Sequence, residues 1–163
     1  MTIGLLSDTH GNLAVVEKAV AVFREQAVSS IFHCGDIGSF EVLTQLSTLK
    51  VPVHAVLGNV DRFSSNWDEA SMLSGLHLHG RFGDIACGST RIALLHSDDR
   101  ITRDRTILSG EYDFVFTGHT HVFHDYSVEG TRCINPGTAG RGAPNTCAVL
   151  DLDSGVLQQI ELV

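Results

Sequence analysis

The first half of the chain alternates short apolar runs with amphipathic stretches. Three apolar runs have the length of buried strands: residues 3–6, 30–33 and 51–57. Between the first two, residues 13–27 carry apolar side chains at spacings of three and four, which is typical of a helix that buries one face. Asn12 stands where an N-cap is expected, and residues 40–49 form a second predicted helix. Strands separated by helices predict right-handed βαβ units and a largely parallel sheet.

The second half of the chain is richer in strand patterns. Strands are predicted over residues 91–96, 113–117, 124–128, 131–135, 146–152 and 156–162. A helix is predicted over residues 102–109, and Asp153-Ser154-Gly155 is a hairpin signal between the last two strands. Residues 62–83 are polar with scattered leucines, and we expect a loop there with room for one short helix. Two sheets packed face to face, with helices outside, would accommodate this mixture.

The composition is typical of a globular protein. The 163 residues, of which 43% are apolar and 18% charged, suffice for one domain with its own core, so we expect a single domain over residues 1–163. The net charge of −8 argues against a nucleic-acid partner, which usually requires a basic surface.

The sequence also indicates where the protein functions. No run approaches the roughly 18 apolar residues of a membrane-spanning helix, so no membrane partner is expected. The N-terminus lacks the basic and long apolar segments of a signal peptide. The four cysteines are Cys34, Cys87, Cys133 and Cys147. Because they form no CxxC pair, we expect reduced, mostly buried thiols in a cytoplasmic protein.

Polar side chains of the kind that bind metals follow five of the predicted strands. The five clusters are Ser7-Asp8-Thr9-His10, His33-Cys34-Gly35-Asp36, Gly58-Asn59-Val60-Asp61, His96, and Gly118-His119-Thr120-His121. Ligands of α/β sheets bind beyond the carboxyl ends of strands, so these clusters are predicted to converge on one crevice. Carboxylate, amide and imidazole ligands together suit Mn, Fe, Zn or Ni rather than Ca. Glycines 35, 58 and 118 are expected to let the backbone turn sharply at the strand ends.

This ordered set of motifs resembles the calcineurin-like metallophosphoesterase superfamily. In size and pattern the chain is similar to its small bacterial and archaeal phosphodiesterase branch, from Asp8 to the segment Asn135-Pro136-Gly137-Thr138. The resemblance implies an α/β fold: a four-layer αββα sandwich of two mixed β-sheets with helices outside, and a dinuclear metal site at the strand C-terminal ends. By the same resemblance, Asp8, His10 and His121 would hold one metal, Asn59, His96 and His119 the other, and Asp36 would bridge both.

The resemblance also implies an activity. The chain would be a metal-dependent phosphoric ester hydrolase that cleaves a small phosphodiester by means of a hydroxide bridging two metal ions. We expect the two divalent ions to be Mn, with Fe, Zn or Ni as alternatives. Two other functions stay open: a phosphomonoesterase or nucleotide pyrophosphohydrolase on the same site, and a metal-binding protein-interaction scaffold. The sequence does not indicate an oligomeric state.

Three residues are predicted to act in catalysis: Asn59, His96 and Asp61. Asn59 and His96 would border the phosphate as metal ligands. Asp61 is a candidate to orient His10 or His96 or to donate a proton, with a solvated turn aspartate as the alternative. Val60 stands where many larger relatives have a histidine that serves as general acid.

The remaining polar residues receive smaller roles. Ser97 replaces a glycine that is frequent in the small branch, and its side chain would either crowd the site or form a hydrogen bond near it. His33 should point away from the ligands, which favours a structural role. Arg62 or Arg141 could contact a second phosphate or an acidic group of the substrate. Four histidines have no partner spacing and receive no role: His54, His77, His79 and His124.

Overall fold

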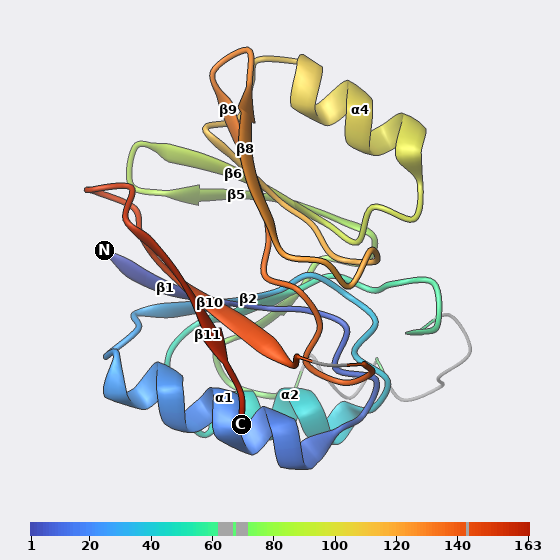
Figure 1. Ribbon diagram of the computed structural model, residues 1–163, viewed down its shortest axis with the longest axis vertical. Helices are drawn as coiled ribbons and strands as arrows, with labels where there is room; N and C mark the ends of the chain where they lie inside the picture. The colour runs from blue at the N-terminus through green and yellow to red at the C-terminus, as the bar shows by residue number, and fades with distance from the viewer. Residues whose placement is uncertain (62–66, 68–71, 143) are drawn as a thin grey trace.

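The chain folds into four stacked layers, with two helices below a first sheet and one helix above a second (Figure 1). The computed structural model describes residues 1–61, 67, 72–142 and 144–163. The helices are α1 (Leu13–Glu25), α2 (Phe40–Ser47) and α4 (Arg100–Leu108). Asn12 caps α1 as predicted, since its side chain accepts a hydrogen bond from the Val15 N–H. The αββα sandwich of two mixed sheets is confirmed.

The first sheet has six strands in the order β11-β10-β1-β2-β3-β4. Their bounds are β1 (Thr2–Leu6), β2 (Ser30–His33), β3 (Val53–Ala55), β4 (Leu76–Leu78), β10 (Thr146–Asp151) and β11 (Leu157–Glu161). Strands β1, β2 and β3 pair in parallel, as the alternation of strands and helices predicts, and β4 extends this parallel part. Strand β10 is antiparallel to both β1 and β11, which makes the sheet mixed.

The second sheet has five strands in the order β5-β6-β7-β9-β8. Their bounds are β5 (Phe82–Cys87), β6 (Thr90–Leu95), β7 (Phe114–Phe116), β8 (His124–Val128) and β9 (Thr131–Asn135). The central strands β6, β7 and β9 are parallel, and each outer strand is antiparallel to its neighbour. Parallel strands β6 and β7 therefore end at the same edge of this sheet.

Three hydrophobic cores fill the three spaces between the layers. Successive strand residues point to opposite faces, so neighbours in one strand belong to different cores. Leu5 packs between the two sheets, whereas Leu6 packs against α1 and α2. Likewise Leu94 packs between the sheets and Leu95 packs under α4. Strands β1, β2 and β10 are buried on both faces, which explains why they appear in the sequence as continuous apolar runs.

Two strands lie where the sequence predicted a loop. The loop prediction for residues 62–83 is wrong at 76–78, which form β4, and at 82–83, which begin β5. Strand β4 has only three residues, which are too few to show a hydrophobic periodicity in the sequence. These three residues are a strand because they pair in parallel with β3. The part of the prediction that concerns 62–66 and 68–71 lies outside the described residues.

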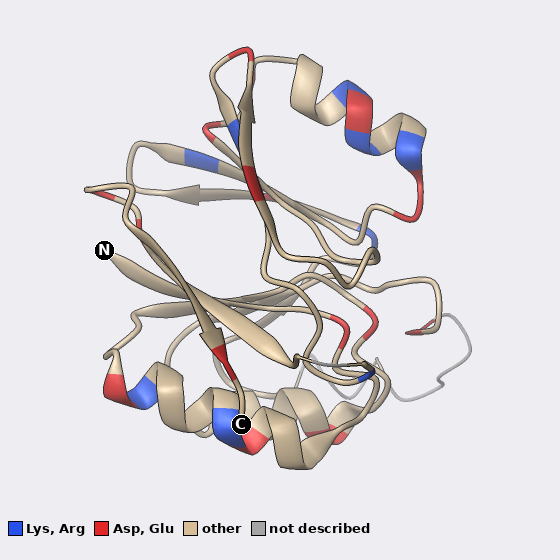
Figure 2. Ribbon diagram, viewed as in Figure 1, with Lys and Arg blue, Asp and Glu red and all other residues tan. Residues whose placement is uncertain are grey.

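Charged residues lie mainly on the helices and in loops (Figure 2). All four cysteines are free, and Cys34, Cys133 and Cys147 are buried, which confirms the prediction of reduced, mostly buried thiols. Within the described part of the chain, no helix combines the length and the hydropathy needed to cross a membrane.

Candidate metal centre

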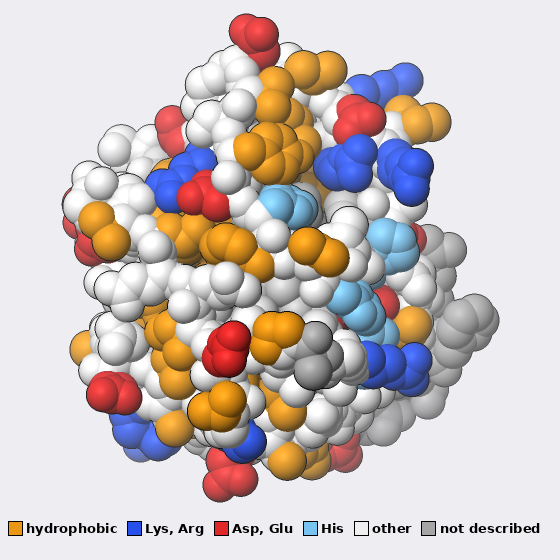
Figure 3. Space-filling view, in the orientation of Figure 1, with side chains coloured by type: hydrophobic (Ala, Val, Ile, Leu, Met, Phe, Trp, Pro, Cys, Tyr) orange, Lys and Arg blue, Asp and Glu red, His pale blue; other side chains and the backbone are white. Residues whose placement is uncertain are grey.

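The loops that follow β1, β2, β3, β6 and β7 meet at one end of the molecule. Backbone hydrogen bonds tie them together: the Asp8 N–H donates to the Gly35 carbonyl at 3.0 Å, and the Gly118 N–H donates to the His96 carbonyl at 3.2 Å. On the face shown in Figure 3, most of the visible histidine side chains lie toward the right-hand edge. The five predicted clusters thus converge.

Two groups of side chains in this crevice have donor atoms within 4.8 Å of one another, and Asp8 belongs to both. In the first group, His121 Nε2 lies 3.2 Å from Asp8 Oδ1 and 3.5 Å from His10 Nε2. In the second group, His96 Nε2 lies 3.3 Å from Asp36 Oδ1 and 4.0 Å from Asp8 Oδ1. The other oxygen of Asp36 lies 3.8 Å from His10 Nε2, so Asp36 faces both groups.

The two remaining predicted ligands border the second group. Asn59 Oδ1 lies 3.1 Å from His96 Nε2. The His119 ring stands edge-on to the His96 ring, with 5.1 Å between centroids, and the His119 N–H donates to Asp8 Oδ2 at 3.1 Å. All seven predicted ligand residues therefore lie in one crevice.

Asp8 shows that the site fits a cation. Its Oδ2 accepts hydrogen bonds from the Ser7 hydroxyl at 2.6 Å and from the His119 N–H. Its Oδ1 is buried and accepts no hydrogen bond from any residue that the structure describes. Burial raises the pKa of this carboxyl. An unpaired oxygen on a buried carboxylate is unfavourable unless an ion pair or a metal compensates it.

His96 is held in one orientation by the loop after β2. Its Nδ1 lies 2.9 Å from the Cys34 carbonyl, which can only accept, so Nδ1 carries the proton. Nε2 is then the atom that faces the carboxylates of Asp36 and Asp8, which outweigh burial and raise the pKa of His96, so Nε2 would release its proton on binding a metal.

His33 connects the same loops from behind the site. Its Nδ1 accepts from the Gly35 N–H at 3.2 Å, so its Nε2 donates to the Thr9 hydroxyl at 2.9 Å. Full burial lowers the pKa of His33 to about 3. A neutral, doubly hydrogen-bonded ring agrees with the structural role predicted for this residue.

Backbone strain is concentrated at the centre. Nine non-glycine residues among those described have a positive φ, and five of them are predicted ligands: Asp8, His10, Asp36, His119 and His121. This conformation is unfavourable by about 1 kcal/mol or more per residue and is enriched at functional sites. Ser97, with φ of 76°, also adopts it, and its hydroxyl donates to the Gly118 carbonyl at 3.2 Å. Of the two predicted possibilities for Ser97, the structure shows the hydrogen bond.

The three glycines of the motifs serve two different purposes. Gly35 has a φ of 93° and makes the sharp turn that was predicted. Gly58 and Gly118 do not have a positive φ, so for them the predicted reason is wrong. A Cβ on Gly58 would overlap the Asp36 carboxylate, and one on Gly118 would overlap the Ser7 hydroxyl. These two glycines allow the ligand loops to approach each other closely.

Asp61 contacts the backbone rather than a histidine. Its Oδ2 accepts from the N–H groups of Ile37 at 3.1 Å and Gly58 at 2.8 Å, and its Oδ1 accepts from the Gly38 N–H at 2.9 Å. The residue is 1% exposed, so the solvated-turn alternative is wrong. The predicted contact with His10 or His96 is also wrong for the described residues, because both oxygens are engaged by the backbone. The structure shows a carboxylate that fastens the loops after β2 and β3 together.

A second group of histidines lies outside the centre, and no spacing along the chain indicates it. His54 of β3 pairs in register with His77 of β4, and their rings are nearly parallel with centroids 4.8 Å apart. His54 Nδ1 lies 3.0 Å from His79 Nε2. We call these three residues the histidine cluster. Its assembly depends on the β3–β4 register, which cannot be derived from spacing when β4 itself is not detected.

Comparisons with known proteins agree with this geometry. Residues 1–155 match the family model of the calcineurin-like phosphoesterase superfamily domain. Phosphodiesterase MJ0936 of Methanocaldococcus jannaschii is 29% identical to this chain over 99% of each protein. A probable metallophosphoesterase of Methanothermobacter thermautotrophicus is 33% identical over 85% of this chain and 77% of its own length. The solved structure of an archaeal phosphodiesterase matches with a TM-score of 0.90 at 28% identity, over 99% of this chain and 100% of that one.

Proposed function

The chain belongs to the calcineurin-like phosphoesterase superfamily, and on that premise we propose that it is a phosphodiesterase whose centre holds two divalent cations, with Mn²⁺ as the metal. One observation carries the proposal: two donor groups share Asp8, whose buried Oδ1 has no hydrogen-bond partner among the described residues. A carboxylate shared by two groups of ligands suits two neighbouring cations better than one.

The proposed ligand assignment keeps the first group and, in the second, replaces the shared Asp8 with the neighbouring Asn59 and His119. Asp8, His10 and His121 hold one cation, and Asn59, His96 and His119 hold the other, with Asp36 between them. The distances of the two Asp36 oxygens to His96 and His10, 3.3 and 3.8 Å, support the bridging role of Asp36. Two cations, when bound, would lower the pKa of a water molecule and neutralise charge on the phosphoryl oxygens.

The chain itself supplies preorganisation. Burial alone would raise the pKa of Asp36, but the hydrogen bond and charge of His96, together with the Val60 N–H, outweigh burial and lower it. Asp36 is therefore ionised at neutral pH. His96 is fixed by the Cys34 carbonyl, and Asp61 holds the loops that carry Asp36 and Asn59. Groups held in place before the substrate binds need no reorganisation during the reaction.

A covalent mechanism through the neighbouring cysteine is disfavoured. Cys34 is fully buried, and burial raises the pKa of its thiol well above the usual range. Since the thiolate is the nucleophilic form, this side chain is unreactive at neutral pH. We assign it to the core between the two sheets.

A preference for diesters is the finer part of the proposal. It rests on the names of two similar proteins, which are phosphodiesterases. The test compares bis-p-nitrophenyl phosphate with p-nitrophenyl phosphate, using protein stripped of metal and then reloaded with Mn²⁺. We expect metal-dependent hydrolysis with the larger kcat/KM for the diester. Faster hydrolysis of the monoester would indicate a phosphomonoesterase, and bound metal without turnover of either compound would indicate an interaction scaffold.

We further propose that residues 1–163 act as one metallophosphoesterase domain on a small phosphate ester in the cytoplasm. The three cores support one domain, because the strands of each sheet contribute to the core on either side. The four free cysteines support a reducing compartment.

A further inference from the structure

A pocket of about 520 Å³ opens beside the candidate metal centre. Its lining includes His121, Val122, Phe123, Thr138, Arg141 and Pro144. His121 is at once a wall of this pocket and a proposed metal ligand. A molecule whose phosphate lies at the metals therefore has room to extend an attached group into the pocket.

The side walls of the pocket suit an organic group. Val122, Phe123 and Pro144 supply apolar surface, and Val122 is 63% exposed although it directly follows a proposed ligand. Binding sites for small molecules typically combine such apolar walls with a few polar groups that fix orientation. The walls therefore favour an apolar or planar arm, such as a nucleoside, over a purely charged one.

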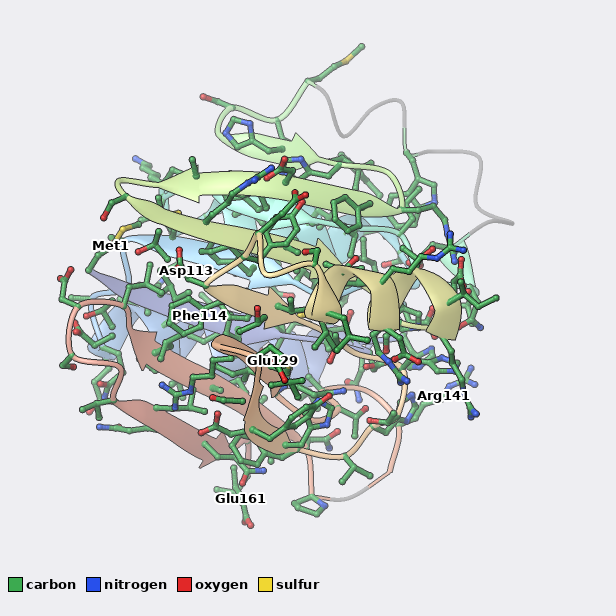
Figure 4. The ribbon with its side chains drawn as sticks, turned by 90° about the horizontal axis from the view of Figure 1, so that it is seen from above. Met1, Asp113, Phe114, Glu129, Arg141 and Glu161 are labelled. Atoms are coloured by element: carbon green, nitrogen blue, oxygen red, sulfur yellow. The ribbon has the colours of Figure 1, made fainter. Side chains whose placement is uncertain are left out.

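Arg141 is the cationic group of the pocket. Its guanidinium forms no ion pair or hydrogen bond with any residue in the described part of the chain, whereas Arg81, Arg91 and Arg132 each pair with an aspartate. Figure 4 places Arg141 at the opposite end of the molecule from Met1, which is the end toward which β1 carries Asp8. A guanidinium without an acidic partner is free to bind a phosphate through two parallel hydrogen bonds.

The loop that carries Arg141 is fastened to the metal centre. The Gly140 carbonyl accepts a hydrogen bond from Asn12 Nδ2 at 3.2 Å, and the Thr138 hydroxyl lies 3.2 Å from the Asp8 carbonyl. Gly140 packs so closely on this loop that a Cβ there would overlap the Thr9 carbonyl. The backbone position of Arg141 is therefore fixed relative to Asp8.

We propose that this pocket binds one organic arm of the diester, and that Arg141 recognises a second phosphate carried by that arm. The inference rests on the proposed function and deepens it. A phosphodiester bears a single negative charge, which two divalent cations already compensate. The charge of Arg141 is then available for a further anionic group, so the substrate class is a diester with a nucleoside-like arm that bears an additional phosphate.

Two substrates that differ by one phosphate test the proposal: thymidine 5′-(p-nitrophenyl phosphate) and its 3′-phosphorylated counterpart. For the wild type we expect a kcat/KM about tenfold larger for the 3′-phosphorylated compound, equivalent to about 1.4 kcal/mol. Arg141→Ala should bring this ratio close to one, and Arg141→Lys should keep part of it. Arg24→Ala is the matched control, because it removes the same charge about 18 Å along α1 from Asn12. It should keep the wild-type ratio.

A binding measurement separates this proposal from the proposed function. Calorimetry on Mn²⁺-loaded protein compares thymidine 3′,5′-bisphosphate with thymidine 5′-monophosphate. We expect tighter binding of the bisphosphate by the wild type and equal binding by Arg141→Ala. A preference that survives in Arg141→Ala, or is missing in the wild type, overturns the role of Arg141 even if diesters are hydrolysed. If no diester is hydrolysed but the preference depends on Arg141, the phosphodiesterase proposal fails and the pocket assignment stands.

Discussion

The metal centre and the histidine cluster both consist of closely spaced histidines, but the surroundings of the rings differ. In both, ring nitrogens approach closely: His10 and His121 at 3.5 Å, His54 and His79 at 3.0 Å. In the centre, carboxylates stand among the rings, and one carboxylate oxygen lacks a hydrogen bond from the described residues. In the cluster, the rings contact each other and Phe32. Close imidazoles therefore do not by themselves indicate a metal site, whereas imidazoles around a buried carboxylate oxygen that accepts no hydrogen bond do.

The backbone conformation also distinguishes the metal centre from the histidine cluster. His10, His119 and His121 have positive φ values in loops, whereas His54 and His77 lie in regular strands. Strained residues persist where the surrounding structure holds them, which is common at functional sites. The comparison predicts that changes in the centre affect metal binding and activity, and that changes in the cluster affect only stability.

The largest effect is expected from Asp36→Asn. An amide in place of the bridging carboxylate removes one negative charge between the cations, and we expect kcat/KM to fall on the order of 10³-fold, which is about 4 kcal/mol of transition-state stabilisation. At least one cation per chain should also be lost, as measured by elemental analysis. The control, His54→Gln in the cluster, should keep both metals and normal turnover. Normal turnover of Asp36→Asn with two metals bound would contradict the bridging assignment.

Asp61→Asn should reveal how the strained loops are held. The amide nitrogen cannot accept from a backbone N–H, so at least one of three buried hydrogen bonds is lost and a donor faces a donor. We expect the metal-free protein to lose about 2–3 kcal/mol of unfolding free energy in urea titration. Asp104→Asn on the exposed face of α4 is the control and should change it by about 0.5 kcal/mol or less. Equal stability of the two variants would show that Asp61 is not a structural anchor.

Mn²⁺ should stabilise the folded protein through the centre alone. Ligands that bind only the folded state add about 2.7 kcal/mol at a concentration of 100 times Kd. Histidines bind metal in their neutral form, so the rise in Tm should be present at pH 8 and fade as the pH falls through about 6. His54→Gln should show the same rise as the wild type. A rise of equal size at pH 5 and pH 8 would argue against histidine ligands.

The sequence predicted the centre better than its surroundings, for a physical reason. Each ligand motif lies directly after an apolar strand, and the parallel strands of each sheet end at one edge, so local patterns sufficed to place the ligands at the strand ends. The stacking of the two sheets brings the two edges together. The roles of Asp61 and Gly58 depend instead on atoms of other loops, which spacing along the chain does not reveal. Strand β4 could not be detected, because three residues are too few to show a period. The histidine cluster was missed along with it.

The smallest expected effect concerns the histidine cluster. It is a dependence of the unfolding free energy on pH, measured without metal. Burial and the neighbouring His77 and His79 lower the pKa of His54 from 6.5 to about 4. The unfolded chain therefore takes up a proton at His54 as the pH falls below about 6.5, while the folded protein does so only near pH 4. The stability that His54 contributes is complete above pH 6.5 and is lost as the pH falls toward 4.

Because the side chain is only half-buried, we expect this loss to be about 1 kcal/mol, well below what the full shift implies. In metal-free protein, the drop in unfolding free energy between pH 7.5 and 4.5 should be smaller in His54→Gln than in the wild type by that amount. His33 is present in both proteins, so its own titration cancels in this difference. An identical drop in the two proteins would mean that His54 does not contribute to the pH dependence of the stability.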